Sequence, residues 1–268
     1  MNQKAIKKQS KIPQDIVGTI AILKFKKRVP WLIKKYRAYK FLKQHKNVLT
    51  VVEKTSAFSG KLRIPTTKYL AGEKTYKTTY KENNCIFKFN INNSYFSPRL
   101  SNERKIISEE VNKLTKKKNT DILIMFAGIG PYPITIAKTL LKQKKPFHIY
   151  ANELNKLALQ EMQQNIHLNK LSKHITILPG DANNIPTQQK FDIILMPRPN
   201  LKETFLKSAL KLSKKDTTIF YHGFGTKDTV LKEIKKDTSN KTSNVKIRKA
   251  GDIAAYKFRW QAKFRVKN

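Results

Sequence analysis

The chain of 268 residues contains one cysteine, few acidic residues and no long apolar run. Because Cys85 has no second cysteine to pair with, the chain cannot be a secreted scaffold held by internal disulfides. No apolar stretch approaches the ~20 residues that span a bilayer, and the polar, lysine-rich start lacks the apolar segment of a secretory signal. We therefore expect a soluble, cytoplasmic protein without membrane contact.

Acidic residues are scarce: 18 Asp and Glu stand against 56 Lys and Arg, which gives a net charge of +38 at pH 7. Hydrophobic residues still make up 39%, which is enough for a folded core. Lysine and arginine attract polyanions by releasing their counterions, so the excess indicates a nucleic-acid partner. Codon drift in an A+T-rich genome would also supply lysines, but it would tend to raise the acidic residues with them.

The first third of the chain has an irregular pattern of short elements. Residues 1–14 are polar and basic and are predicted to form a flexible arm. An apolar run at residues 16–25 predicts one strand, and a helical pattern at residues 30–44 follows it. The apolar residues that define this helical pattern are Trp31, Ile33, Tyr36, Tyr39 and Leu42. With further short strands punctuated by glycine and proline, residues 1–94 are predicted to form a small α+β domain.

From residue 121 the pattern changes to regular alternation of apolar runs and helical segments. Strands are predicted at residues 121–126, 148–152, 175–178, 191–196, 217–224, 245–248 and 254–266. Helices are predicted at residues 131–142, 154–168, 201–212 and 227–236. Repeated β-α-β units with continuous apolar strands are typical of a parallel sheet covered by helices on both faces. Residues 95–268 are therefore predicted to form a doubly wound, Rossmann-like α/β domain.

A glycine turn, FAGIGP at residues 126–131, follows the first strand of this domain. Ligands of doubly wound sheets bind beyond the carboxyl ends of the strands, and Gly128 and Gly130 allow a sharp turn or close packing there. Glu153 ends the second strand, where a carboxylate accepts hydrogen bonds from both ribose hydroxyls or favours a helix start. Asp181 follows the third strand as an acceptor for an adenine amino group or as an ordinary turn residue.

The turn does not match the common nucleotide-binding fingerprints. Pro133 stands where the dinucleotide motif G-x-G-x-x-G has its third glycine, and no G-x-x-x-x-G-K-[ST] phosphate loop is present. A glycine turn with an acid after each of the next two strands suits S-adenosylmethionine (AdoMet) better than NAD. We expect AdoMet as the cofactor and no metal, because the five histidines are scattered and have no cysteine partners.

Several segments match one known family: residues 16–23 (IVGTIAIL), 46–54 (KNVLTVVEK), 70–73 (LAGE), 95–104 (YFSPRLSNER), 125–131 (MFAGIGP), 165–170 (NIHLNK) and 180–181 (GD). YFSPRLSNER followed about 20 residues later by MFAGIGP is the most specific combination. On these segments the chain resembles, from about residue 15 to its end, the archaeal and eukaryotic type of tRNA (guanine-37-N1)-methyltransferase, a class I AdoMet-dependent family.

The resemblance implies methyl transfer from AdoMet to N1 of the guanine 3′ of the anticodon, with the small domain helping to bind tRNA. It implies a cofactor pocket formed by Arg104, Phe126, Ala127, Gly128, Gly130, Glu153, Leu154, Asp181, Ala182 and Pro197. Arg99 is expected to act as the catalytic residue, because a guanidinium near O6 stabilises the charge that develops there; a phosphate contact or a salt bridge is the alternative role for this arginine. We expect a monomer that binds the anticodon stem-loop of tRNA.

The chain departs from the family pattern in three places. It begins without the extra N-terminal domain of many members, Ile124 stands where an acid commonly precedes MFAG, and Pro197-Arg198-Pro199 replaces Asn-Leu-Pro after the fourth strand. Arg198 is interpreted as an RNA contact or as an exposed loop arginine. Residues 138–147, where the general base was sought, contain no carboxylate.

The general base is therefore not assigned. Glu103 is the nearest candidate in sequence, with an ion pair to Arg104 or a helix-start role as alternatives. The aromatic residues Tyr95, Phe96 and Tyr132 either receive the target base or fill the core, and Cys85 is expected to be an inert buried thiol.

Two other functions remain open at this point. A related enzyme transfers the aminocarboxypropyl group of AdoMet to a wyosine-type tRNA nucleoside, but it has a glycine where Pro197 stands here. A non-catalytic RNA-binding protein of the same fold is the second alternative. The changes at Ile124 and Pro197 leave it open, whereas the intact Gly128, Gly130, Glu153 and Asp181 argue against it.

Overall fold

The protein is described here from a computed structural model, which describes residues 12–55, 66–116, 119–239, 241–254 and 257–267. Of the basic arm predicted at residues 1–14, residues 1–11 lie outside this range, and Gln14 already begins the first strand. No helix in the described part of the chain is long and apolar enough to cross a membrane.

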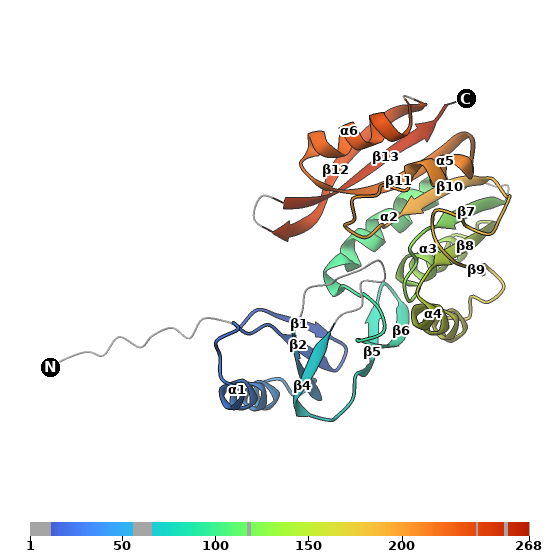
Figure 1. Ribbon diagram of the computed structural model, residues 1–268. Coiled ribbons are helices and arrows are strands. Elements are labelled where there is room, and N and C mark those ends of the chain that lie inside the picture. Colours follow the sequence, from blue (N-terminus) through green and yellow to red (C-terminus); the bar gives the residue numbers. More distant parts are fainter. Residues whose placement is uncertain (1–11, 56–65, 117–118, 240, 255–256, 268) are drawn as a thin grey trace.

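The larger sheet has seven strands in the order β12-β13-β11-β10-β7-β8-β9 (Figure 1). Its parallel strands are β7 (Thr120–Ile124), β8 (Phe147–Glu153), β9 (Ile175–Pro179), β10 (Phe191–Met196) and β11 (Ser213–Gly225). The last two strands, β12 (Thr242–Ala254) and β13 (Lys257–Val266), are antiparallel to each other, and β13 is antiparallel to β11. This arrangement confirms the predicted doubly wound sheet with two added strands.

Helices cover both faces of this sheet, because alternate residues of its strands point to opposite sides. On one side Ile122 and Ile124 of β7 pack with α2 (Ser101–Leu114), α3 (Pro131–Lys142) and α4 (Lys156–Leu168). On the other side Leu123 packs in a core with α5 (Leu206–Lys211) and α6 (Lys227–Asp237). Helix α2 was not predicted, and α5 is shorter than the helix predicted at residues 201–212.

A second, four-stranded sheet forms the N-terminal part of the molecule, in the order β1-β2-β3-β4. Its strands are β1 (Gln14–Val17), β2 (Ile20–Leu23), β3 (Thr50–Lys54) and β4 (Thr67–Gly72). The single strand predicted at residues 16–25 is wrong, because Gly18, with φ +58°, turns the chain into the β1–β2 hairpin. A Cβ on Gly18 would lie 2.2 Å from the carbonyl oxygen of Thr79, so only glycine fits this turn.

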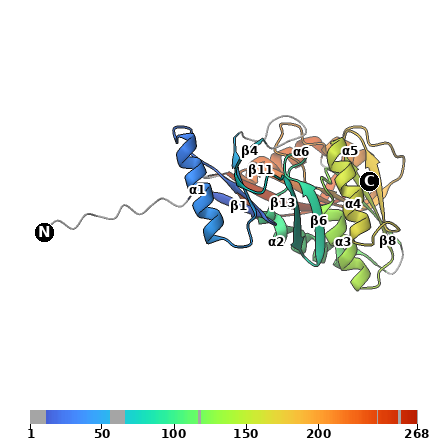
Figure 2. The same cartoon turned by 90° about the horizontal axis from the view of Figure 1, so that it is seen from below.

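Helix α1 (Trp31–Gln44) covers one face of the four-stranded sheet, at the side remote from the seven-stranded sheet (Figure 2). Its bounds confirm the predicted helix, but it buries Ala38 and Phe41 rather than the aromatic residues that suggested it. Tyr36 and Tyr39 are 67% and 56% exposed. Residues three apart drift around a helix of 3.6 residues per turn, so the spacing identified the helix but not its buried face.

A separate hairpin of β5 (Lys77–Glu82) and β6 (Cys85–Asn90) packs against α3 and α4. The outer edge of β6 has no neighbouring strand, and side chains of α4 replace one. Glu161, Asn165 and Asn169, spaced four apart on α4, accept hydrogen bonds from the backbone N–H groups of Asn90, Lys88 and Ile86 at 2.8, 2.7 and 3.1 Å, respectively. We call this set of bonds the α4–β6 ladder.

The ladder explains the NIHLNK segment, which contains Asn165 and Asn169. The Asn165 amide also donates to the carbonyl of Ile129, in the glycine turn, at 3.1 Å. The hairpin therefore adheres to the large sheet's helices, although the division predicted at residue 94 assigns it to the small domain; that boundary stays a prediction.

Candidate active site

The glycine turn between β7 and α3 lies at the carboxyl edge of the large sheet, where Phe126, Gly128 and Gly130 all have positive φ values of 58°, 57° and 93°. The two glycines have different roles. A Cβ on Gly130 would lie 3.0 Å from Ile134 and 3.1 Å from Met162, so this glycine serves close helix packing. A Cβ on Gly128 would meet no atom nearer than 4.0 Å, so this glycine borders open space.

Glu153, the last residue of β8, binds the glycine turn to the start of α4. Its Oε2 accepts a hydrogen bond from the Gly128 N–H at 2.7 Å, and its Oε1 accepts from the N–H groups of Leu154 and Asn155 at 3.0 and 2.8 Å. Burial raises the pKa of Glu153, and these three backbone donors oppose the rise only in part. The carboxylate keeps lone pairs for further donors, as two ribose hydroxyls would be.

A pocket opens beside Glu153 at the ends of β8 and β9. It is lined by Phe126, Asn152, Glu153, Leu154, Gly180, Asp181, Ala182, Pro199, Leu201 and Phe205. Five of the residues predicted to bind the cofactor therefore meet here: Phe126, Glu153, Leu154, Asp181 and Ala182. The buried Asn152 amide fixes the far wall by donating to the carbonyls of Leu178 and Gly180 at 2.9 and 3.0 Å.

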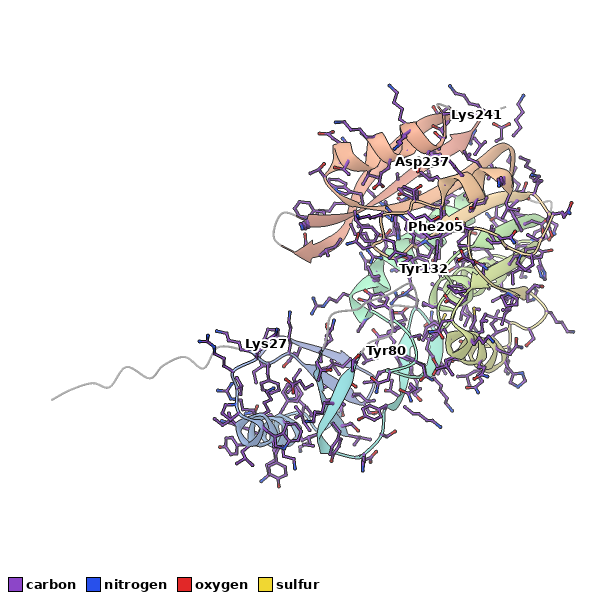
Figure 3. The ribbon with its side chains drawn as sticks, in the orientation of Figure 1. Lys27, Tyr80, Tyr132, Phe205, Asp237 and Lys241 are labelled. Carbon is purple, nitrogen blue, oxygen red and sulfur yellow. The ribbon has the colours of Figure 1, made fainter. Side chains whose placement is uncertain are left out.

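Two aromatic rings narrow this pocket to about 40 Å³. Phe126 and Phe205 meet edge to face, with their ring centroids 4.9 Å apart. Phe205 lies directly before α5 (Figure 3) and has a φ of +61°, which is unusual for a bulky residue. The two rings therefore form one wall of the pocket.

Arg198 is neither an RNA contact nor an exposed loop residue, and both predictions for it are wrong. It is only 1% exposed, and its guanidinium donates to the carbonyls of Leu201 and Glu203 at 2.9 and 3.1 Å. It also pairs with Glu233 of α6 at 3.2 Å and lies over the Tyr221 ring. Arg198 therefore holds the loop that carries Pro199, Leu201 and Phe205 into the pocket wall.

A second carboxylate, that of the buried Glu103, lies near the N-terminus of α2 and contacts strands far away in sequence. It forms a two-pronged ion pair with Arg248 of β12 at 2.7 and 2.9 Å, and its Oε1 lies 3.2 Å from His222 Nε2 in β11. Burial alone would raise the pKa of Glu103, but the bonds from His222 and Arg248 outweigh burial and hold it below the usual value. The predicted pair with Arg104 is not formed.

His222 is completely buried, and this burial lowers its pKa, so the ring is neutral at pH 7. A carboxylate only accepts hydrogen bonds, so Nε2 carries the ring's hydrogen and donates to Glu103. Four enclosed polar atoms near this contact have no hydrogen-bond partner within the described residues: Tyr132 Oη, His222 Nδ1, Arg248 Nε and Gln261 Nε2. Unsatisfied buried groups are rare and concentrate at sites that bind water or ligand.

The two predicted arginines occupy different environments. Arg104 does not line the pocket beside Glu153: it is 2% exposed, pairs with Glu82 of the hairpin, and donates to the Ser97 carbonyl at 3.0 Å. Arg99 is exposed and forms an ion pair with Asp15 of β1 at 2.7 Å. Of the remaining predicted residues, Ala127, Gly128, Gly130 and Pro197 lie in the turn or after β10 but do not line the pocket.

Of the aromatic candidates, Phe96 packs in the core against Tyr80, Phe87 and Phe89, and Tyr132 is 4% exposed. The backbone carbonyl of Tyr95 lies closest to the open side of Gly128. Cys85 is buried, and burial raises its pKa to about 11, which agrees with an unreactive thiol.

The chain is similar to known proteins over most of its length. The family model described as the TRM5/TYW2 methyltransferase domain matches residues 78–248. A tRNA (guanine(37)-N(1))-methyltransferase Trm5b of Pyrococcus abyssi is 34% identical over 212 residues, which cover 79% of this chain and 59% of that protein. The tRNA (guanine(37)-N(1))/4-demethylwyosine(37)-methyltransferase Taw22 of Nanoarchaeum equitans is 44% identical over 133 residues, covering 50% of this chain and 41% of that protein. The chain thus spans less than two thirds of these relatives.

Solved structures agree with this similarity. The structure of aTrm5 in complex with tRNALeu matches 96% of this chain and 72% of that chain, with a TM-score of 0.84 and 26% identity. The structure of Trm5b from Pyrococcus abyssi matches 96% of this chain and 75% of that chain, with a TM-score of 0.81 and 27% identity.

Proposed function

The chain belongs to the TRM5/TYW2 methyltransferase family, and from this premise we propose that it transfers the methyl group of AdoMet to N1 of guanine 37 in tRNA. The observation that carries the proposal is the placement of two carboxylates in different settings around one glycine turn: the half-buried Glu153 beside the pocket and the buried Glu103 beside Tyr132. The curated relatives named as guanine-37-N1 methyltransferases support the acceptor.

The residues of the pocket suit the nucleoside part of AdoMet. Glu153 offers lone pairs to the ribose hydroxyls, while Asp181 and Ala182 lie where the adenine edge would be bound. Gly128 leaves space beside Glu153 for the remainder of the cofactor. When bound, AdoMet supplies an electrophilic methyl group on a sulfonium. The chain's own contribution is to hold this group in line with the acceptor nitrogen and to exclude water.

Removal of the N1 proton requires a base, and we propose Glu103 for this role. It is ionised at neutral pH, because its pKa lies below the usual value, so it has lone pairs to accept the proton; the bonds from His222 and Arg248 that lower this pKa also make it a weaker base than a free carboxylate. His222 and Arg248, which lie on strands of the large sheet, donate hydrogen bonds to the Glu103 carboxylate and fix its orientation. A base within hydrogen-bond reach typically contributes about 10²–10⁴-fold to the rate.

Arg99 stays a proposed partner of the guanine O6. Its side chain is 72% exposed, so it is free to turn, and the exposed pair with Asp15 is of the weak kind that a charged substrate readily replaces. Charge on O6 develops as N1 loses its proton, and a guanidinium is always protonated to meet it.

The positive charge of the chain supports tRNA as the partner, and one related structure is a complex with tRNA. Phosphate contacts release counterions, so tRNA affinity is expected to fall steeply between about 50 and 200 mM salt. An affinity that is flat over this range would contradict electrostatic docking.

The similarity to one relative makes 4-demethylwyosine a second candidate acceptor, which should be tested in parallel with guanine. The relative with 44% identity is named for both guanine-37 and 4-demethylwyosine-37 methylation. The same pocket and the same carboxylate would serve both bases, since each is a purine-derived acceptor at position 37.

The decisive experiment measures transfer of labelled methyl from AdoMet to an unmodified tRNA transcript with guanine at position 37. A transcript with adenine at that position is the control. Label in the first and not in the second establishes reaction and target together. If label appears only in tRNA that carries 4-demethylwyosine, the acceptor is that nucleoside and not guanine. If the protein binds AdoMet but transfers no methyl group to any tRNA, the methyltransferase proposal is refuted.

A further inference from the structure

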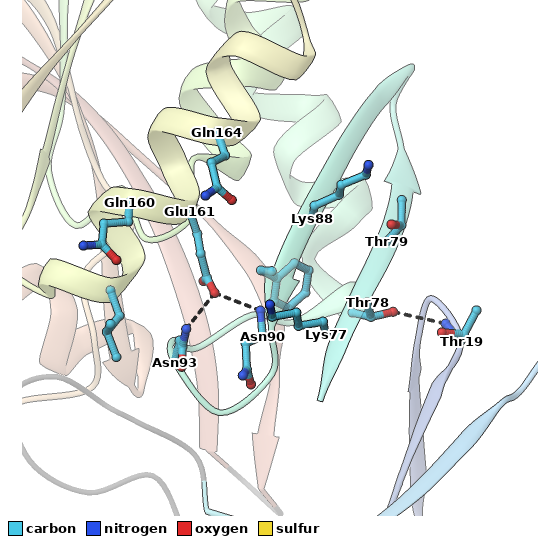
Figure 4. A pocket seen from close by; sticks show the side chains of 12 residues that line it. Thr19, Lys77, Thr78, Thr79, Lys88, Asn90, Asn93, Gln160, Glu161 and Gln164 are labelled. Atoms are coloured by element: carbon cyan, nitrogen blue, oxygen red, sulfur yellow. Dashed lines mark hydrogen bonds between the residues drawn. The ribbon is translucent and has the colours of Figure 1, made fainter. Parts of the chain in front are cut away.

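A groove of about 610 Å³ lies between the β5–β6 hairpin, α4 and Thr19 of the N-terminal sheet (Figure 4). It shares no lining residue with the pocket beside Glu153. Its volume is in the range of sites that enclose a ligand of nucleotide size. The proposed methyl transfer uses none of its side chains.

Among the described residues, four polar side chains that line the groove form no contact that stabilises the fold. Lys77 and Lys88 project from the hairpin, and Gln160 and Gln164 project from α4 (Figure 4). Within the described part of the chain, none of these four side chains makes a hydrogen bond or an ion pair. Leu157 also lines the groove and is 44% exposed, so the groove includes an apolar surface besides the polar groups.

The walls of the groove are fixed before any ligand binds. Glu161, 8% exposed, accepts hydrogen bonds from the Asn90 N–H at 2.8 Å and the Asn93 amide at 2.9 Å (Figure 4). These bonds belong to the α4–β6 ladder and its continuation, so the hairpin and the helix keep their spacing. On the other side Thr78 accepts a hydrogen bond from the Thr19 N–H at 3.2 Å. A preformed site loses less conformational entropy on binding.

The lining matches the three parts of a nucleotide. The two lysines outnumber the single acid, Glu161, and therefore favour binding of a phosphate. The side-chain amides of Gln160 and Gln164 offer hydrogen-bond donors and acceptors to the edge of a base. Leu157 offers an apolar surface to the face of a base. We propose that this groove binds one nucleotide of the RNA substrate, outside the target base. The proposal rests on the proposed tRNA methyltransferase function.

The position of the groove favours RNA over a free nucleotide. The Asn93 carbonyl accepts from the Asn155 amide at 2.7 Å, and the Asn155 N–H in turn donates to Glu153 at 2.8 Å. The groove wall is therefore two hydrogen bonds away from the carboxylate of the nucleoside pocket. A substrate whose target base must reach the methyl group of a cofactor held in that pocket brings neighbouring nucleotides close to the groove.

The test compares three variants of the full chain in binding to a tRNA transcript with guanine at position 37. Lys77→Gln with Lys88→Gln is expected to reduce the slope of log affinity against log salt by about 1–2. Gln160→Ala with Gln164→Ala leaves the charge unchanged and is expected to weaken binding about 5–10-fold, since two hydrogen bonds are lost. Lys81→Gln, exposed on the same hairpin but outside the groove, is the control for loss of one charge, and twice its change in slope is compared with that of the Lys77–Lys88 pair.

The proposal is overturned if the glutamine pair binds as the wild type does and the Lys77–Lys88 pair changes the slope by no more than twice the change that Lys81→Gln causes. It is equally overturned if uridine or guanosine monophosphate binds in the groove while tRNA affinity is indifferent to all three variants. Methyl transfer by the wild type is measured in parallel on the same transcript. A wild type that binds tRNA through the groove but transfers no methyl would refute the proposed function and leave the groove standing.

Discussion

Two glutamates near the same edge of the sheet are held in opposite ways. Glu153 is bound by three backbone N–H groups and no cation, and its pKa is raised. Glu103 is bound by an arginine and a histidine, and its pKa is lowered. The difference shows how one residue type acquires opposite pKa shifts: burial with only backbone donors raises the pKa of one carboxylate, while an arginine and a histidine lower that of the other, which suits the two roles proposed above.

The largest expected effect is the fall in kcat when the negative charge of the Glu103 side chain is removed. Glu103→Gln should lower kcat by about 10²–10⁴-fold, because the amide cannot take up the N1 proton. AdoMet affinity should be unchanged, since Glu103 lies outside the nucleoside pocket. Single-turnover methyl transfer and calorimetric AdoMet titration measure the two quantities.

Glu110→Gln is the matched control, because Glu110 lies on the same helix and pairs with Lys263 at the surface. If the Glu103→Gln variant retains more than about a third of the wild-type kcat, Glu103 is not the general base. The comparison of two carboxylates with different roles would then no longer hold.

The next effect is a difference in the free energy of unfolding between substitutions of the two glycines in the turn beside Glu153. Gly130→Ala should lower the free energy of unfolding by about 2–4 kcal/mol, because a left-handed backbone and a crowded Cβ both oppose alanine. Gly128→Ala has only the backbone strain and should cost about 1–2 kcal/mol. Urea denaturation measures both, and equal losses would show that the two glycines have the same structural role.

A smaller change is expected when the backbone-held carboxylate itself is altered. Glu153→Gln should raise the AdoMet dissociation constant about 10–100-fold, because one ribose acceptor and one acceptor of a turn N–H are lost. At saturating AdoMet the methyl transfer rate should stay close to that of the wild type. Glu109→Gln, exposed on α2, is the control. An unchanged dissociation constant would separate Glu153 from cofactor binding.

The smallest effect is a difference in pH dependence between the two glutamates. With its pKa lowered, Glu103 adds stability that is present above the unfolded value of about 4.3 and lost as the pH falls below it. With its pKa raised, Glu153 costs stability as the pH rises through the interval above about 4.3. The destabilisation caused by Glu103→Gln should therefore shrink toward acid, and that caused by Glu153→Gln should shrink toward neutral pH.

Denaturant unfolding of wild type and both variants between about pH 3 and 7 tests this, with each unit of pKa shift worth about 1.4 kcal/mol. Two difference curves that slope in the same direction would show that the environments of the two carboxylates are alike.

Local sequence patterns predicted those elements whose structure depends mainly on residues close by in the sequence. The β-α-β alternation from residue 121 and the glycine turn are of this kind, and so are the acids Glu153 and Asp181 at strand ends. These residues meet because the carboxyl ends of parallel strands share one edge. Nothing beyond the order of strands is required to bring them together.

The remaining features depend on partners far away in sequence. Glu103 meets His222 and Arg248 across 119 and 145 residues, and no local pattern identifies such partners. Arg198 follows a strand and is charged, so a loop position was the natural interpretation, yet carbonyls of its own loop and Glu233 bury it. The turn at Gly18 depends on a close approach to Thr79, which only the folded chain reveals.

The α4–β6 ladder has a consequence for the behaviour of the chain outside its function. A strand edge with free N–H groups is a template on which another chain can add, and proteins limit such edges to avoid aggregation. Here Glu161, Asn165 and Asn169 occupy alternate donors of β6, so this edge offers no row of free groups to a second molecule. The side chains of α4 therefore act as a protective cover that keeps a concentrated, highly charged protein from associating strand to strand.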